Sequence, residues 1–90
     1  MEKSVMRLLY YNPDTDTVDI WLGNPSSESY AEPLTENLIG KHNNRGETIG
    51  LEIITLNKLN AEDMKRMPAN ARAVLKESAA RLSIASRSKK

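Results

Sequence analysis

A turn followed by a strand in the middle of the chain constrains the fold most. Residues 43–46 read Asn-Asn-Arg-Gly, and asparagine and glycine adopt the positive φ of tight hairpin turns at low cost. In residues 48–56, Ile49, Leu51 and Ile53 alternate with small or polar residues, as in a strand with one buried face. The preceding part of the chain must therefore supply strands that pair with residues 48–56.

Three residues leave the details of this strand open. Ile54 breaks the alternation, which indicates either a β-bulge or burial of both faces beneath a helix. Gly50 weakens a strand interior, so either another group approaches the backbone closely there or the glycine is incidental. Glu52 is expected to face water; a buried Glu52 would need a basic partner, namely Lys58, Arg7 or His42.

The N-terminal part of the chain predicts a β-hairpin over residues 4–22. Residues 5–11 are rich in strand formers, and residues 12–16 contain Pro13 among Asn and Asp residues that bond turn backbone. The second strand has two distinct faces, with Val18, Ile20 and Leu22 opposite Thr17, Asp19 and Trp21. Residues 38–42 predict a third strand. Residues 30–36 stay undecided, because Pro33 suits only an edge strand or a bulge.

The C-terminal third of the chain has the signals of a helix. Asn60 is a suitable N-cap, and two acids follow in the first turn, where the helix dipole favours them. Pro68 predicts that a helix over residues 61–67 ends or kinks there, and that a second helical segment covers residues 69–82. An apolar stripe with helical spacing consists of Met64, Met67, Ala71, Val74, Leu75, Ala79 and Leu82.

These elements predict an α+β fold: a small four-stranded antiparallel meander of two β-hairpins, followed by a C-terminal kinked or broken helix. The expected division is an antiparallel β domain over residues 1–58, an amphipathic helical extension over residues 59–84, and a disordered basic tail over residues 85–90. Such a thin sheet beside an apolar helical stripe favours self-association, so we expect a homodimer.

Few residues carry the chemistry of an enzyme. His42 is the only histidine, and no serine near it lies in a nucleophile motif, so a solvated strand histidine is expected. Asp14, Asp16 and Asp19 lack the spacing of a calcium loop, and turn chemistry explains them better than a cation does. We therefore expect no catalytic, cofactor-binding or metal-ligating residues, and no enzymatic activity.

The absence of cysteine removes disulfides and thiolate sites, as is typical of a reducing compartment. No apolar run reaches the length of a signal peptide or of a membrane span, so a cytoplasmic protein without membrane contact is expected. The aromatic residues Tyr10, Trp21 and Tyr30 form either an exposed contact patch or a surface covered by the helix or by a second copy.

Charge is distributed unevenly along the chain. Residues 1–60 hold five Lys and Arg against nine Asp and Glu, a net charge of −4, whereas residues 61–90 hold eight against three, a net charge of +5. A basic C-terminal segment can lie on its own acidic half, on a second copy or on an acidic partner.

Two motifs, quoted in order, carry a family resemblance. Residues 11–22 read Tyr-Asn-Pro-Asp-Thr-Asp-Thr-Val-Asp-Ile-Trp-Leu, and residues 46–53 read Gly-Glu-Thr-Ile-Gly-Leu-Glu-Ile. Together they resemble the Tyr-Asp-Pro-x-x-Asp-x-x-x-Ile-x-Leu opening and the Asp-Gly-x-x-Val-Gly-Ile-Glu-Ile close of a family of small prokaryotic domains of unknown function. The resemblance covers roughly residues 6–56 and implies a small antiparallel β domain.

The chain departs from that family in two places. Gly40, Lys41 and His42 stand where members often carry acids, and Arg45 replaces the usual acid before Gly46, so a shared acidic ion site is not expected. Members are often encoded beside small toxins, so the resemblance implies an antitoxin-like role. The helical extension lies outside the resemblance.

The function expected from these features is that of a non-enzymatic protein-interaction module, antitoxin-like, which lays its amphipathic helix into a groove of a small protein partner. The expected partner-binding residues are Met64, Met67, Arg72, Val74, Leu75, Lys76, Arg81 and Leu82. The alternative is a nucleic-acid-associated protein that uses its basic C-terminal tail, although no nucleic-acid-binding motif accompanies that tail.

Overall fold

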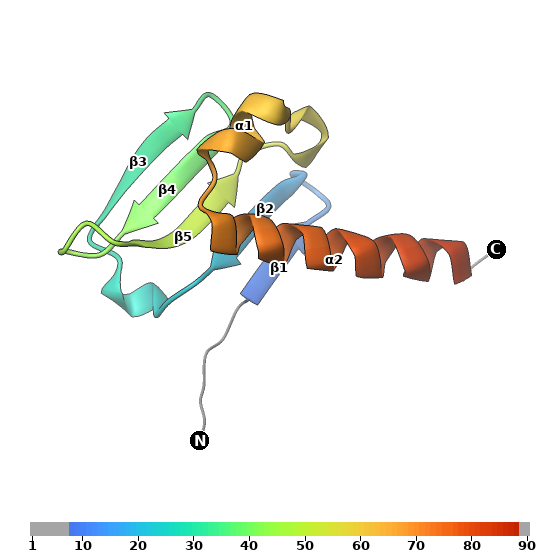
Figure 1. The fold of residues 1–90 in the computed structure, drawn as a ribbon, viewed down its shortest axis with the longest axis horizontal. Helices are drawn as coiled ribbons and strands as arrows, with labels where there is room; N and C mark the ends of the chain where they lie inside the picture. Colours follow the sequence, from blue (N-terminus) through green and yellow to red (C-terminus); the bar gives the residue numbers. More distant parts are fainter. Residues whose placement is uncertain (1–7, 89–90) are drawn as a thin grey trace, which may run out of the picture.

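A computed structural model describes the backbone of residues 8–88 and the side chains of residues 9–78. It shows an antiparallel sheet followed by two helices, which is an α+β fold (Figure 1). The elements in chain order are β1 (Leu8–Asn12), β2 (Thr17–Trp21), the 3-10 turn η1 (Pro25–Ser27), β3 (Tyr30–Thr35), β4 (Leu38–His42), β5 (Thr48–Ile53), the 3-10 turn η2 (Leu56–Lys58), α1 (Ala61–Arg66) and α2 (Ala69–Ser88).

The sheet differs from the expected four-stranded meander in both strand number and strand order. It has five strands in the order β1-β2-β5-β4-β3, so β5 lies between β2 and β4. The fifth strand is β3, which occupies an edge and carries Pro33 at a shift in the pairing register with β4. The alternating apolar residues of β5 explain its central place, because a strand between two partners buries the largest share of its inner face.

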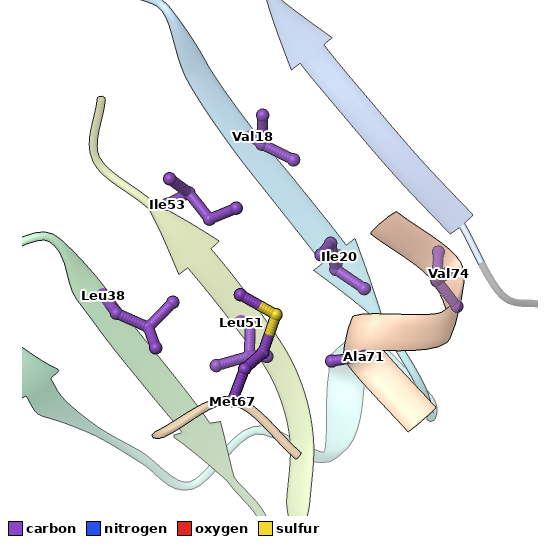
Figure 2. Packing of buried hydrophobic residues seen from close by; sticks show 8 residues of the cluster. All are labelled: Val18, Ile20, Leu38, Leu51, Ile53, Met67, Ala71 and Val74. Carbon is purple, nitrogen blue, oxygen red and sulfur yellow. The ribbon is translucent and has the colours of Figure 1, made fainter. Parts of the chain in front are cut away.

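One face of the sheet, here called the inner face, packs against the helices. Val18 and Ile20 of β2 lie opposite Ile53 and Leu51 of β5, as the alternation predicts. All four side chains are at most 1% exposed. Figure 2 shows these side chains meeting residues from β4 and from the helical region; the whole cluster is Val18, Ile20, Leu38, Leu51, Ile53, Met67, Ala71 and Val74.

The helices begin at the residues that the sequence indicated, Ala61 and Ala69, whereas α2 ends at Ser88 and not at Leu82. Asn60 accepts a hydrogen bond from the N–H of Asp63, and Asp63 in turn accepts one from the N–H of Asn60, which forms a capping box. Pro68 follows the C-cap Met67 and separates α1 from α2, so the kinked or broken helix consists of two helices.

The strand β5 ends at Ile53, so neither explanation offered for Ile54 holds. Ile54 lies past the strand end and is 39% exposed, and its N–H donates to the carbonyl of Asn37. Gly50, by contrast, has a definite role. A Cβ at Gly50 would lie 2.8 Å from Cε3 and Cζ3 of Trp21, because the indole ring of β2 packs directly on the β5 backbone.

The helix α2 crosses the inner face over β2 and β1 and then continues past the β1 side of the sheet (Figure 1). Its backbone is helical through Ser88, including part of the stretch where the sequence predicted a disordered tail from residue 85. No proline or glycine follows Pro68, so nothing in the local sequence stops the helix earlier. Residues 89–90, the end of that predicted tail, lie outside the described residues.

Candidate interaction surfaces

The apolar stripe of the two helices is largely used within the chain itself. Met67 and Val74 are 2% and 4% exposed and belong to the core. Met64 and Leu75 are partly buried and pack against the same core. These four side chains were expected to contact a partner. The structure instead places them on the chain's own sheet, and their apolar surface provides the burial that the thin sheet lacks.

The three basic residues expected at the rim of the partner site have different positions. The guanidinium of Arg72 donates from Nη1 to the carbonyls of Met64 and Met67, at 2.9 and 2.7 Å. It therefore satisfies carbonyls at the C-terminal end of α1 and joins the two helices. Lys76 is exposed. The side chains of Arg81 and of the apolar Leu82 lie outside the described range, although both positions belong to α2.

The opposite side of the sheet, here called the outer face, carries one cation between two acids. Lys41 lies 3.7 Å from Asp19 and 4.0 Å from Glu52, and its Nζ is 4.7 Å from the centroid of the Trp21 ring. Lys41 is thus the basic residue beside Glu52, a role for which the sequence suggested Lys58, Arg7 or His42. Ion pairs of this length at a surface contribute about 0–1 kcal/mol each, so the group orients side chains more than it stabilises the fold.

The aromatic residues form neither a single contact patch nor a surface that the chain's own helices cover. Tyr10 pairs with Asp19 across the β1–β2 ladder, which places Tyr10 on the outer face with Trp21. The helices lie on the inner face and do not cover these two rings. Tyr30 lies at the start of β3, on the far edge of the sheet, where its ring stacks on His42 at a centroid distance of 5.0 Å.

His42 is buried rather than solvated, with 7% of its surface exposed. Its Nδ1 lies 3.2 Å from the hydroxyl of Thr48, and its Nε2 lies 3.0 Å from a carboxylate oxygen of Glu32. The carboxylate is close enough for an ion pair, but its direction gives no hydrogen bond to Nε2. The ring is enclosed by β3, β4 and β5. The sequence did not predict this burial, because residues 30–35 were not recognised as a strand.

Asp16 connects the first hairpin to the segment after β5. It has a positive φ of 60°, and its carboxylate accepts hydrogen bonds from the N–H of Asn57 at 2.8 Å and from the hydroxyl of Tyr11 at 2.7 Å. The bond from the Asn57 backbone, followed by that from Tyr11, lowers the pKa of Asp16. The same bond to Asp16 raises the pKa of Tyr11. Asp16 was expected to serve its own turn; instead it binds a distant segment.

The other two aspartates of the first hairpin have separate surroundings. The N–H of Asp14 donates to the side chain of Asn12, which is the expected turn bond, and Asp19 faces Lys41. Asp16 faces Asn57, so the three carboxylates do not converge. Among the described residues, no three side chains of His, Cys, Asp or Glu gather in a way that would hold a metal ion.

The described residues line at least two clefts on the surface. The larger, of about 540 Å³, lies between the β3–β4 turn and α1 and is lined by Thr35, Glu36, Asn37, Ile54, Thr55, Lys58, Asn60, Glu62 and Asp63. Its buried Asp63 already accepts a 2.7 Å hydrogen bond from Thr35 and one from the Asn60 backbone. The smaller cleft, of about 420 Å³, is lined by Ser27, Glu28, Ser29, Asn43, Asn44 and Arg45.

Neither of these two clefts is lined by His42, Thr48 or Glu32. Within the part of the chain that the structure describes, no helix is long and apolar enough to cross a membrane.

Comparison with known proteins adds no relative. No protein-family model, no curated protein and no solved structure matches this chain. The resemblance carried by residues 11–22 and 46–53 therefore stays a hypothesis, and function has to be argued from the surfaces described above.

Proposed function

We propose that this chain is a non-enzymatic protein-interaction module that contacts another polypeptide through the distal part of α2, and that it acts in the manner of an antitoxin. The supporting observation is the length of α2. This helix has 20 residues, and among the side chains that the structure describes, those of α2 in or against the core, Ala71, Val74 and Leu75, lie in its first turns. The remainder of the helix backbone continues beyond the sheet (Figure 1).

A helix segment that extends past the sheet gains little from its own hydrogen bonds. Isolated helices shorter than about 12–15 residues are marginal in water, because nucleation is costly and each further residue adds little. Residues 79–88 of α2 thus have the length at which packing, rather than propensity, decides helical stability. A partner surface would supply that packing, and this is the physical reason to place the binding site there.

The sequence of the distal part continues the spacing of the stripe. Leu82 follows Leu75 by seven residues and Ser78 by four, which are the intervals of one helix face. The exposed Lys76 and the nearby Arg81 would flank this apolar position with positive charge, which suits a groove with an acidic rim. In this proposal Leu82 takes over the anchoring role for which Met67 and Val74 are no longer available.

The mechanism would be occlusion, in which an amphipathic helix fills an apolar groove that the partner needs for its own activity. The complex would form in the cytoplasm. The alternative, a basic helix that binds nucleic acid, rests on Arg81, Arg87 and the terminal lysines. It predicts binding that weakens steeply with salt, since each phosphate contact releases counterions.

A capture experiment tests the proposal. The full chain, a chain ending at Ser78 and the Leu82→Glu variant are used as bait in a host extract, with and without nuclease. Asn44→Glu, in the exposed β4–β5 turn, is the matched control for added charge. One stoichiometric small protein that survives nuclease, binds the control and is lost with Leu82→Glu would support the proposal. A partner retained equally by all four baits would refute it, and a partner lost on nuclease treatment would favour nucleic acid.

A further inference from the structure

The two edges of the sheet are unequal. The edge strand β3 carries Pro33, the charged Glu32 and a register shift between Pro33 and Thr35. Prolines, charges and bulges are the devices by which proteins keep an edge strand from pairing with another chain. The edge strand β1 reads Leu-Leu-Tyr-Tyr-Asn over Leu8–Asn12 and has none of them. Its described residues therefore form a regular edge that can accept a further strand.

The backbone groups available on β1 follow from the ladder. The N–H of Leu22 donates to the carbonyl of Ile49, so Ile20 and Val18, two and four residues earlier, also direct their backbone groups toward β5. The intervening residues of β2 then bond to β1, where their partners are Leu8, Tyr10 and Asn12. It follows that the N–H and C=O groups of Leu9 and Tyr11 point to the free side of β1.

The helix above this edge extends over the same free side. Figure 1 shows α2 passing β1 and continuing beyond it, and α2 contacts both β2 and β1 before it does so. A strand added beside β1 would thus lie beneath the distal part of α2. A strand added at this edge would therefore have the free backbone groups of β1 beside it and the distal part of α2 above it.

We propose that this place is filled by a second copy of the chain, paired through β1 in antiparallel fashion across a two-fold axis. The pairing that uses every free group of both strands is centred on Tyr10, with Leu9 opposite Tyr11 of the second copy and Tyr10 opposite its own equivalent. The two sheets become one continuous sheet, and each α2 covers β1 and β2 of the other copy.

Exposure and charge support a second copy as the occupant. Tyr10 and Tyr11 are 57% and 43% exposed, and they lie on opposite faces of the strand that would become central. The overhanging segment contains Arg81 and Arg87 without any acid after Glu77, whereas residues 1–60 carry a net charge of −4. Crossing of the helices brings the basic segment of each copy to the acidic half of the other.

This inference rests on the proposed function, because the second copy is itself a polypeptide that the distal part of α2 would contact. Its first test is a proline on the edge. Tyr11→Pro removes the outward N–H that the pairing needs, and Tyr11→Val is the matched control, which shortens the side chain but keeps that N–H. Light scattering after size exclusion is expected to give twice the 10.1 kDa chain mass for the natural chain and for Tyr11→Val, and the single mass for Tyr11→Pro.

A cysteine cross-link gives a second readout that survives if Tyr11→Pro fails to fold. The chain has no cysteine, so Tyr10→Cys and Tyr30→Cys each introduce a single thiol, on the β1 edge and the β3 edge respectively. Cysteines directly opposite each other in adjacent strands have Cα separations of about 4.5–5.5 Å, which a disulfide can span. Tyr10→Cys is expected to form a covalent dimer in air at least tenfold faster than Tyr30→Cys.

The inference would be overturned if the natural chain is monomeric at about 100 μM. A dimeric Tyr11→Pro variant, or equal cross-linking of the two cysteine variants, would also overturn it. The proposed function fails in a different way. A monomer that still captures a partner through Leu82 would overturn only the dimer, whereas a β1-paired dimer that captures no other protein would overturn only the antitoxin-like role.

Discussion

Gly50 offers the sharpest test of the packing described here, because one methyl group decides the outcome. In Gly50→Ala the new Cβ would lie 2.8 Å from two ring carbons of Trp21 and 3.3 Å from the carbonyl oxygen of Ile20. Carbon atoms pack best at about 3.5–4.0 Å, so the indole must retreat by roughly 0.7–1.2 Å from the 2.8 Å contact. That movement also pulls the ring from Lys41, whose Nζ lies 4.7 Å from its centroid.

Two opposing effects set the size of the change. Overpacking of this kind costs about 1–3 kcal/mol. Alanine in place of glycine restricts the unfolded chain and returns about 0.4–1 kcal/mol. We therefore expect Gly50→Ala to lower the free energy of unfolding by about 1–2 kcal/mol, which shifts the melting temperature of a domain of this size downward by about 4–16 °C.

Urea denaturation of four chains provides the assay: the natural chain, Gly50→Ala, Trp21→Leu and the double variant. If the clash with the indole ring causes the loss, Gly50→Ala should be harmless or stabilising once Trp21 is replaced, which gives a coupling free energy of about 1–2 kcal/mol. A Gly50→Ala variant as stable as the natural chain, or equal losses in both backgrounds, would show that the ring does not press on the β5 backbone.

Three further predictions concern the joints between elements. Arg72→Ala should lower the free energy of unfolding by about 1–3 kcal/mol, because the Met67 carbonyl loses its Arg72 donor and the Met64 carbonyl keeps only the N–H of Met67. The exposed control Lys76→Ala should change the free energy of unfolding by less than about 0.5 kcal/mol, and chemical denaturation compares the two variants. Asp63→Ala removes half of the capping box and the acceptor of the Thr35 hydroxyl, so its expected cost by the same assay is about 1–3 kcal/mol. The folded-state pKa of Asp16 is lowered, so its contribution is full above the ordinary carboxyl value of 3.8 and is lost as the pH falls through the lowered pKa. The stability gap between the natural chain and Asp16→Asn should therefore be present near neutral pH and close in acid; a gap that stays constant with pH would contradict the assignment.

The sequence anticipated the parts of the fold that depend on local patterns. The two faces of β2, the N-cap Asn60 and the break at Pro68 follow from alternation, capping and the missing proline N–H. Each of these signals is contained within a few consecutive residues, which is why it can be recognised without tertiary information.

The errors concern pairings between distant segments. The position of β5 between β2 and β4 depends on which strands bury the most apolar surface together, and no local pattern states it. The burial of His42 follows from β3, whose Pro33 concealed the strand. Arg72 carries an ordinary exposed-face pattern, yet it binds carbonyls of the preceding helix, because the break at Pro68 brings that helix end within reach.

The candidate site was anticipated only in part for the same reason. An amphipathic stripe shows that a helix has an apolar face, but it does not show whether that face is covered by the same chain. Met67 and Val74 meet the chain's own sheet, whereas α2 continues past β1, where the proposal places contacts with another polypeptide.

Hydrogen exchange along α2 tests the central claim most directly. The amides of residues 71–75 should be protected at every concentration, because their helical turns pack on the chain's own core. The amides of residues 79–88 should exchange freely in dilute chain and gain at least tenfold protection when the chain is concentrated or bound to a partner. Distal amides that stay equally unprotected in every state would contradict the proposal that this part of α2 is the contact element.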